Sequence, residues 1–489
     1  MTRMSTIVQQ DLILAGHREP GAAEPIDVVY PYTGEVIARV GAASRADVER
    51  AIEAAQDTFR LYRDEPAHRR SALLHGVSAR IAERREELAR DITYETGKAI
   101  WESRLECDRA VTTFRIAAEE ATRIDGEIVP LDGVPAGQGR LGEVRRFPIG
   151  PVAAITPFNS PFNLVAHKVA PALAAGNTIV VKPASATPLS ALNVGALVIE
   201  TAAELGLPGG LISVLPCSPD AAEPLVTDPR IRGLSFTGSS PVGWALRARA
   251  GRKKVSLELG GNGAVIVHHD GDIALASERV AFGGYLLAGQ VCSSVQRVYV
   301  HEDVADAFTA ALVERASAIR VGDPFDEETT MGPMLTDEAA EKAERWLAEA
   351  VDDGARILAG GTREGTLFQP TVITDTRPEM RVTCEEIFAP VVVLERYRDL
   401  DDALAAANAT EYGLQAGIFS GDLQVVYKAY RELEVGGVIV NDVNIWRVDS
   451  MPYGGVKSSG YGREGLRYAI REQTEPKLLV LNLDYRPGG

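Results

Sequence analysis

The sequence predicts an α/β protein with two doubly wound domains, each a mostly parallel sheet covered by helices on both faces. Three observations predict this fold. Short apolar runs recur along the chain, helical stretches separate them, and the alternation begins again near residue 263. Continuous apolar strands that alternate with helices are typical of a buried parallel sheet. A chain of 489 residues is also too long for one ordinary core, so at least two domains are expected.

The N-terminal part is expected to be helical. Residues 44–63 begin with Ser44 and Asp47, which resemble a capping box, and their apolar residues fall on one helix face. A second helical stretch is expected over residues 68–97.

The first sheet is expected from four apolar runs, with a helix over Ser190–Leu205 between the second and the third. These runs are Pro151–Thr156, Thr178–Lys182, Leu211–Leu215 and Gly233–Phe236. Ligands bind a sheet of this kind at the carboxyl ends of its strands. The region after Pro151 is therefore expected to hold a binding site.

The second domain is expected to start just after Glu258. Its predicted strands are Gly263–Val267, Arg297–His301 and Gly437–Val440. Two segments fit neither domain: residues 125–147, which are rich in Gly and Pro, and the apolar run at 477–483. A lone apolar strand at a chain end would be an exposed edge, which proteins normally cover. The run at 477–483 could be covered by closing the chain's own sheet.

Composition excludes several classes of function. The formal net charge is −17 and no basic run stands out, so nucleic acid is not an expected partner. No secretory leader and no apolar run long enough to span a membrane is recognised, so no membrane association is expected. The four scattered cysteines argue against a disulfide framework and favour a reducing compartment. A cytoplasmic protein is therefore expected.

Three segments carry candidate chemistry. Cys292 follows a Gly-Gln-Val stretch and precedes small polar residues, Glu258 stands between two leucines, and Asn159 follows a predicted strand. They supply a thiol nucleophile, a carboxylate base and an amide donor. Taken singly, each has an ordinary structural explanation, as a buried thiol, a capping carboxylate or a turn asparagine. The run His268-His269-Asp270 is interpreted as a solvated strand end. Neighbouring side chains on a strand point apart and no third ligand follows at metal spacing, so no metal site is expected.

In this order the motifs make the chain resemble the aldehyde dehydrogenase superfamily. The resemblance implies oxidation of an aldehyde to a carboxylic acid with reduction of NAD or NADP. The Cys292 thiolate would form a thiohemiacetal whose oxyanion Asn159 holds, and Glu258 would activate water to hydrolyse the thioester. In the family the thiol pKa can be lowered by its surroundings.

The resemblance also assigns the domains. Residues 1–124 and 148–258 would form a Rossmann-like cofactor-binding domain, and residues 259–465 the catalytic domain. Residues 125–147 and 466–489 would form a small β arm that pairs across a subunit interface, in a homodimer or a homotetramer.

The cofactor site is expected from motifs that match the family position by position. Its expected residues are Thr156, Pro157, Phe158, Lys182, Ser185, Gly238, Ser239, Gly260, Glu386 and Phe388. Many NAD-preferring relatives carry Glu where this chain has Ser185, and that carboxylate would repel a 2′-phosphate. Ser185 therefore predicts that NADP is tolerated. The stretch Leu215–Pro219 replaces a more glycine-rich segment and leaves the adenine side open.

The substrate pocket is expected from residues that flank the chemistry. They are Ser160, Asn163, Leu164, His167, Val291, Ser293, Trp446 and Arg447. Ser160 and His167 replace aromatic residues of relatives that oxidise large apolar aldehydes, so a small or polar aldehyde is expected. His167 could equally be a core histidine, and Arg447 could meet a polar substrate tail or pair with Asp449.

The segment from Met451 to Lys457, with Pro157–Leu164, is most similar to the lactaldehyde-dehydrogenase-like branch. Other readings stay open: an aromatic-aldehyde or semialdehyde dehydrogenase, a CoA-acylating aldehyde dehydrogenase, or a non-catalytic member of the fold. Glu258 argues against the acylating reading, because enzymes of that type generally lack this base.

Overall fold

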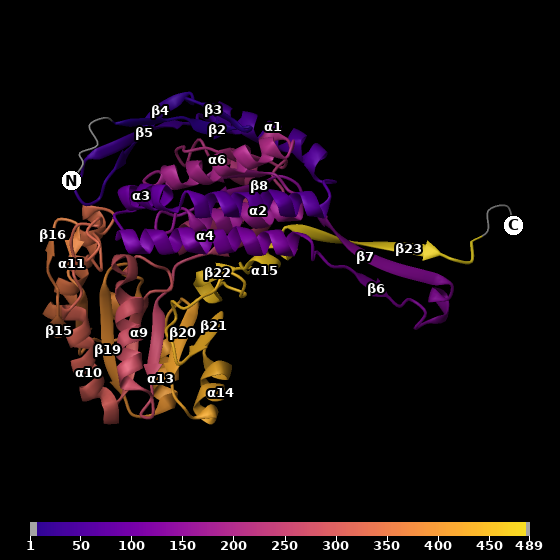
Figure 1. Cartoon of the computed structure of the whole chain (residues 1–489). Helices are drawn as coiled ribbons and strands as arrows, with labels where there is room; N and C mark the ends of the chain where they lie inside the picture. The colour runs from indigo at the N-terminus through magenta and orange to yellow at the C-terminus, as the bar shows by residue number, and fades with distance from the viewer. Residues whose placement is uncertain (1–6, 486–489) are drawn as a thin grey trace.

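The computed structural model describes residues 7–485 and shows two sheets, each covered by helices, with a three-stranded arm projecting from one side (Figure 1). The predicted fold class is confirmed. The predicted cofactor-binding domain includes residues 1–6, and the predicted arm includes residues 486–489. Both ends lie outside the described part of the chain.

The larger sheet has the order β22-β12-β11-β8-β9-β10-β2-β3. Its parallel centre comprises β8 (Val152–Ile155), β9 (Ile179–Lys182), β10 (Ile212–Val214), β11 (Gly233–Thr237) and β12 (Lys254–Glu258). The chain adds β9 and β10 on one side of β8, and β11 and β12 on the other. The winding therefore reverses between β8 and β11, which is where sheets of this kind bind ligands.

The edges of this sheet come from distant parts of the chain. They are β2 (Leu12–Leu14), β3 (His17–Glu19) and β22 (Gly460–Tyr461). A separate N-terminal sheet comprises β1 (Val8–Gln10), β4 (Ala23–Val29) and β5 (Val36–Ala42). The sequence predicts none of these short strands, nor β12. The pairing of β22 with β12 returns the chain to the first domain.

The helices of the first domain largely follow the prediction. Helix α1 starts with a capping box between Ser44 and Asp47. The stretch predicted over residues 68–97 is two helices, because the backbone leaves helical geometry at Arg84. The helices are α1 (Arg45–Tyr62), α2 (Ala67–Glu83), α3 (Arg85–Thr96), α4 (Ile100–Ala121), α5 (Asn163–Ala175), α6 (Pro188–Glu204), α7 (Glu223–Thr227) and α8 (Ser240–Arg249).

The second sheet has the order β15-β18-β19-β14-β13-β20-β21, parallel except for β15. Its strands are β13 (Gly263–Val267), β14 (Val295–His301), β15 (Arg356–Ala359), β18 (Thr371–Thr374), β19 (Val391–Tyr397), β20 (Gln415–Phe419) and β21 (Gly437–Val440). Its helices are α9 (Ile273–Tyr285), α10 (Glu302–Ser317), α11 (Asp337–Asp352), α12 (Arg381–Cys384), α13 (Leu400–Asn408) and α14 (Leu423–Glu432). A hairpin of β16 (Arg363–Glu364) and β17 (Leu367–Phe368) lies outside this sheet. In Figure 1, α4 lies on the side of the first domain that faces the second.

The arm combines three antiparallel strands of the same chain. They are β6 (Glu127–Val129), β7 (Arg140–Pro148) and β23 (Thr474–Asn482). The C-terminal segment of the arm is expected from the sequence to start at residue 466. Its strand β23 starts at Thr474 instead, because Leu466–Glu472 form helix α15. Leu466 and Ile470 of α15 pack into the core of the first domain.

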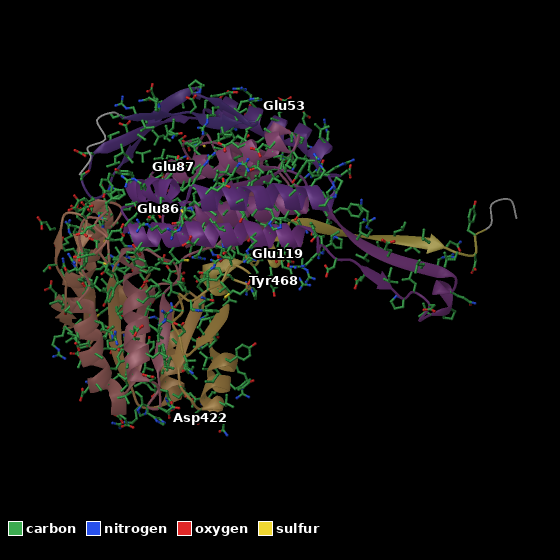
Figure 2. The ribbon with its side chains drawn as sticks, in the orientation of Figure 1. Glu53, Glu86, Glu87, Glu119, Asp422 and Tyr468 are labelled. Atoms are coloured by element: carbon green, nitrogen blue, oxygen red, sulfur yellow. The ribbon has the colours of Figure 1, made fainter. Side chains whose placement is uncertain are left out.

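Charged side chains cover the surface. Glu53, Glu86 and Asp422 lie at the periphery of the molecule (Figure 2), as the acidic composition suggests. Among residues 7–485, no helix has both the length and the apolar character needed to cross a membrane.

Candidate active site

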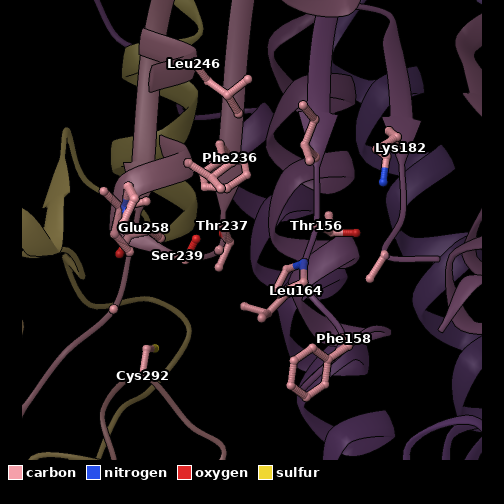
Figure 3. A pocket seen from close by; sticks show the side chains of 18 of the residues that line it. Thr156, Phe158, Leu164, Lys182, Phe236, Thr237, Ser239, Leu246, Glu258 and Cys292 are labelled. Carbon is pink, nitrogen blue, oxygen red and sulfur yellow. The ribbon is translucent and has the colours of Figure 1, made fainter. Parts of the chain in front are cut away.

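A cavity of about 850 Å³ opens at the carboxyl edge of the eight-stranded sheet. This volume falls in the range of about 300–1,000 Å³ that is usual for ligand sites. Cys292 reaches it from the second domain, and Glu258 lies on the same side of the cavity (Figure 3). Phe158 lines the opposite side, and Lys182 lies far from the cysteine. The cavity therefore joins the candidate nucleophile to the sheet edge where a dinucleotide would bind.

The loop before Cys292 has an unusual backbone. Leu287, Ala288 and Gly289 all have left-handed conformations, with φ of 52°, 50° and 70°. Such a conformation costs a non-glycine residue about 1–3 kcal/mol and persists only where surrounding contacts impose it. One of these contacts is the Glu102 carboxylate, whose Oε1 accepts the Leu287 N–H at 2.6 Å. The cysteine is thus held on a strained and anchored loop.

Asn159 lies against this loop. Its side-chain Nδ2 donates to the Gln290 carbonyl at 2.9 Å. An amide carries two N–H groups, so one remains for another acceptor. The contact brings Asn159 beside Cys292 although the two are far apart in sequence, as an oxyanion site shared by both would require.

Helix α4 anchors both catalytic segments through buried carboxylates one turn apart. Glu102 holds the cysteine loop, as described above. The Oε1 of Glu106 accepts the N–H groups of Phe162 and Asn163 at 2.8 and 2.9 Å, just after Asn159. Since burial raises the pKa of Glu102 to about 7, its ionisation is sensitive to these contacts. No motif in the sequence marks either residue.

The environment of the Cys292 thiol disfavours its ionisation. Burial raises the pKa of the thiol to about 11. A contact of 3.5 Å between Sγ and the Tyr453 hydroxyl lowers this pKa, as does the charge of Arg447, while Glu258 and Glu386 raise it. The lowered pKa that the family resemblance suggested is therefore not found in the described pocket, because removing the thiolate from water outweighs the favourable contacts.

Glu258 ends β12 with its carboxyl group buried in the cavity. Neither carboxyl oxygen has a hydrogen-bond partner among the described residues. Burial, and then the nearby Glu464, raise the pKa of Glu258 well above its usual value. Glu464 is itself paired with Lys168 at 3.1 Å. A carboxylate of raised pKa is a stronger base once it is ionised, which suits general-base chemistry.

Arg447 lines the cavity beside the candidate nucleophile. Its guanidinium lies over the Tyr453 ring, 3.9 Å from the ring centroid. Its closest acidic partner is Glu464, with N–O separation of 3.7 Å, and its Nε has no partner in the described structure. The positive charge of Arg447 is therefore only loosely matched and faces the cavity.

The alternative pairing of Arg447 with Asp449 is not observed. Asp449 instead contacts His167 Nε2 and an Arg109 nitrogen, each at 2.7 Å. Burial opposes ionisation of Asp449, but His167 and Arg109 hold its pKa below the usual value. Burial and the Arg447 charge lower the pKa of His167. This agrees with His167 as a core histidine, one of the two alternatives that the sequence left open.

The structure places two of the eight expected substrate residues in the cavity lining and six outside it. Leu164 and Arg447 line the cavity. Asn163 is buried and accepts from the Thr113 hydroxyl at 3.0 Å, and Trp446 is exposed. The expected residues outside the lining are Ser160, Asn163, His167, Val291, Ser293 and Trp446. The polar wall next to the cysteine comes from Arg447 and Tyr453 rather than from Ser160 and His167.

The expected cofactor residues gather along the cavity with one exception. Those that line it are Thr156, Pro157, Phe158, Lys182, Gly238, Ser239, Gly260, Glu386 and Phe388. The rings of Phe158 and Phe388 pack edge to face with centroids 5.9 Å apart. Ser185 is exposed and lies outside the lining.

These residues fit a dinucleotide. The Thr156 and Thr237 hydroxyls are buried at the cavity without a partner in the described chain. Helix α8 starts at Ser240, so its N-terminal N–H groups lie next to the cavity, where they suit a pyrophosphate. Glu386 accepts the Gly261 N–H at 2.8 Å, and burial raises its pKa to about 7. Burial lowers the pKa of Lys182, whose ammonium donates to the Pro183 carbonyl at 3.1 Å.

Comparisons with known proteins agree with this geometry. The model of the aldehyde dehydrogenase family matches residues 18–479. The chain belongs to the aldehyde dehydrogenase family. A 3-sulfolactaldehyde dehydrogenase of Priestia aryabhattai is 44% identical over 99% of this chain and 100% of the relative. A lactaldehyde dehydrogenase of Methanocaldococcus jannaschii is 38% identical over 94% of this chain and 98% of the relative.

Solved aldehyde dehydrogenases share the fold closely. Aldehyde dehydrogenase 21 from Physcomitrella patens, in complex with the product succinate, has a TM-score of 0.96 and 44% identity over 98% of this chain and 99% of that one. Glyceraldehyde-3-phosphate dehydrogenase GapN from Methanocaldococcus jannaschii, complexed with NADP, has a TM-score of 0.91 and 37% identity over 94% and 99%. The predicted enzyme class is confirmed: this protein is an NAD(P)-dependent aldehyde dehydrogenase. The resemblance to the lactaldehyde dehydrogenase branch is confirmed as well.

Several residues of this aldehyde dehydrogenase cavity were missed by the sequence analysis. Tyr453 belongs to the segment that suggested the branch, and an aromatic residue before two glycines was the only signal of its role. Glu464 follows in the same region without any signal. The cavity is also lined by Pro219, which ends the segment that the sequence left open, and by Asp220, Ala222, Glu223, Val226, Pro241, Val242, Ala245, Leu246 and Arg249.

Proposed function

We propose that Cys292 is the nucleophile of this aldehyde dehydrogenase, Asn159 the oxyanion donor and Glu258 the base that activates water. The Cys292 thiolate attacks the aldehyde carbon, and the amide of Asn159 holds the oxygen that becomes negative. Bound NAD or NADP supplies the hydride acceptor. The thioester left on the cysteine is hydrolysed when Glu258 takes a proton from water, which releases the acid and restores the thiol. The meeting of these three side chains at one end of the cavity supports the assignment.

The proposed substrate is a small aldehyde that carries a hydroxyl or acidic group. The observation that carries this proposal is Arg447, whose charge faces the cavity next to Cys292; its polar contacts in the described structure are Glu464 at 3.7 Å and the His167 imidazole at 3.3 Å. An anionic or hydroxylated tail would complete the partners of the guanidinium. Relatives named for sulfolactaldehyde and lactaldehyde, and a solved relative that holds succinate, support this class of substrate.

The test compares Arg447→Met with Arg447→Lys, which keeps the charge. A hydrogen bond to a charged group contributes about 1.5–3 kcal/mol. Arg447→Met should therefore lower kcat/KM about 10- to 100-fold for lactaldehyde, 3-sulfolactaldehyde and succinate semialdehyde, and much less for propanal. Arg447→Lys should retain part of the activity on the acidic aldehydes. An equal loss on propanal and the polar aldehydes would contradict a role of Arg447 in substrate recognition.

We propose that the enzyme accepts NADP in addition to NAD. Ser185 places no carboxylate at the position where many NAD-preferring relatives have one. The acidic residues that line the cavity just after Pro219 are Asp220 and Glu223, and Glu223 is paired with Arg249. Ser185→Glu should lower kcat/KM for NADP at least tenfold more than for NAD. A wild-type enzyme with a large preference for NAD would contradict the proposal.

A homo-oligomer formed through the arm is also proposed. Strand β23 is an edge strand of the arm, and its Leu478, Leu479, Val480 and Leu481 are each 41–51% exposed. An apolar edge strand is a template for pairing with another chain. Light scattering should report a dimer or tetramer, and Leu479→Lys with Leu481→Lys should shift it toward the monomer. A monomeric wild-type protein would contradict the proposal.

A cytoplasmic location is proposed from the cysteines. Cys107, Cys217, Cys292 and Cys384 are all free thiols. Free thiols persist most readily in a reducing compartment. Cell fractionation with an antibody against the protein tests this directly: most of the protein should be found in the cytoplasmic fraction.

A further inference from the structure

Tyr453 contacts the candidate nucleophile directly. Its hydroxyl lies 3.5 Å from Cys292 Sγ, and both residues line the inner end of the cavity. This is the only hydrogen-bond contact that the Tyr453 hydroxyl or the Cys292 sulfur makes in the described structure. Tyr453 is 3% exposed, so its hydroxyl is largely shielded from bulk water.

Arg447 covers the face of the same ring. The guanidinium carbon lies 3.9 Å from the ring centroid, within the range of a cation–π contact. A positive charge on the ring face draws electron density from the phenol and strengthens its O–H as a donor. The side chains Arg447, Tyr453 and Cys292 therefore lie in series, from a cation through a phenol to a thiol.

The geometry points to Tyr453 as a catalytic residue that donates a hydrogen bond to the Cys292 thiolate. The phenol stays protonated throughout, and its proton is shared with the sulfur while the thiolate waits for the aldehyde. When the S–C bond forms, the negative charge moves to the carbonyl oxygen and the hydrogen bond weakens. This assignment rests on the proposed role of Cys292 as nucleophile.

The other groups around the sulfur act on its ionisation through their charge and not through a hydrogen bond. Glu258 and Glu386 face the thiol and oppose its ionisation, while Arg447 assists it through its charge. Glu464 lies next to Arg447 and reduces that assistance. Burial raises the pKa of Tyr453 well above its usual value, so the phenol is a donor at neutral pH and not a competing anion. Tyr453 is thus the group that can give the thiolate a hydrogen bond without adding a charge.

The net effect on rate is smaller than the effect on ionisation. A hydrogen bond from a neutral donor to a thiolate is expected to lower the thiol pKa by about one unit, which means about tenfold more thiolate at a given pH. A stabilised thiolate is also less nucleophilic, with a Brønsted slope of about 0.4–0.5. About tenfold more thiolate then raises the rate of attack about threefold.

The experiment is Tyr453→Phe, which removes the hydroxyl and keeps the ring under Arg447. Thiolate is read from absorbance at 240 nm as a difference from Cys292→Ser, and alkylation of Cys292 by iodoacetamide is mapped by mass spectrometry, both with and without NADP. Tyr453→Phe should hold about tenfold less thiolate at equal pH and be alkylated about threefold more slowly. The control is Tyr62→Phe, another buried tyrosine, whose hydroxyl donates to the Leu173 carbonyl far from the cavity.

Each outcome decides the proposal. Superimposable thiolate titrations of Tyr453→Phe and the wild type would overturn it, and so would a raised aldehyde KM with an unchanged titration. If Tyr453→Phe fails to fold, 3-fluorotyrosine at position 453 serves as the second variant. Its phenol is more acidic and donates a stronger hydrogen bond, so it should lower the Cys292 thiol pKa, whereas Tyr453→Phe should raise it. A wild type in which Cys292 is not alkylated would instead contradict the role of Cys292 as nucleophile. This outcome distinguishes failure of that role from failure of the Tyr453 assignment.

Discussion

Replacing Glu258 with glutamine removes the proposed base and keeps the volume of the side chain. Both carboxyl oxygens lack hydrogen-bond partners in the described structure, so the change breaks no observed contact of this side chain. General-base catalysis contributes about 10²- to 10⁴-fold. At about 1.36 kcal/mol per factor of ten, that is about 2.7–5.4 kcal/mol of transition-state stabilisation. The expected loss in kcat therefore reflects chemistry and not a disturbed pocket.

The assay is a rapid-mixing measurement of reduced cofactor. Glu258→Gln should give a burst of about one reduced cofactor per active site, because the thioester forms and then persists. Steady-state turnover after the burst should fall by about 10²- to 10⁴-fold. Turnover within threefold of the wild type would refute the role of Glu258, and a missing burst would place its role before the thioester.

The same variant makes a prediction on stability. Because burial raises the pKa of Glu258, the folded protein holds a proton above pH 4.5 that the unfolded chain releases. The stability from this proton is present at low pH and is lost as the pH rises, by at most about 1.4 kcal/mol per unit. Glutamine does not titrate, so Tm of Glu258→Gln should fall less than that of the wild type between about pH 5 and pH 8. The exposed Glu53→Gln is the control and should follow the wild type.

Three further predictions concern groups around the site. Asn159→Ala should lower kcat by about 10²- to 10³-fold with a small change in cofactor KM, in steady-state kinetics. Glu102→Gln should loosen the strained cysteine loop, seen as faster hydrogen exchange at Leu287 together with a lower kcat; unchanged exchange would contradict the anchoring role. Because burial raises the pKa of Glu386 to about 7, its carboxylate is lost as the pH falls below that value, so cofactor KM should rise in acid and Glu386→Gln should flatten this dependence.

The sequence predicts the parts of the fold that follow local patterns. The parallel strands from β8 to β11 are continuous apolar runs, and α1 is marked by its capping box, so local rules suffice. Strand β12 and the short N-terminal strands escape prediction because pairing with neighbours, and not their own pattern, makes them strands.

Prediction of the site has a similar limit. Motifs locate Cys292, Glu258 and Asn159, and nearly all of the cofactor residues line the cavity as expected. The support of Glu102 for the cysteine loop joins residues 185 positions apart, which no local motif reveals. The pairing of Asp449 with His167 and Arg109, which leaves Arg447 to the cavity, also depends on three distant segments.

The most direct test is kcat/KM over a panel of aldehydes, with NAD and NADP in parallel and Cys292→Ala as control. The panel contains lactaldehyde, glycolaldehyde, 3-sulfolactaldehyde, succinate semialdehyde, benzaldehyde and octanal. We expect a small hydroxylated or acidic aldehyde to be oxidised at least tenfold more efficiently than benzaldehyde and octanal, and Cys292→Ala to abolish turnover. Preference for benzaldehyde or octanal would contradict the role of Arg447, and turnover by Cys292→Ala would contradict the mechanism itself.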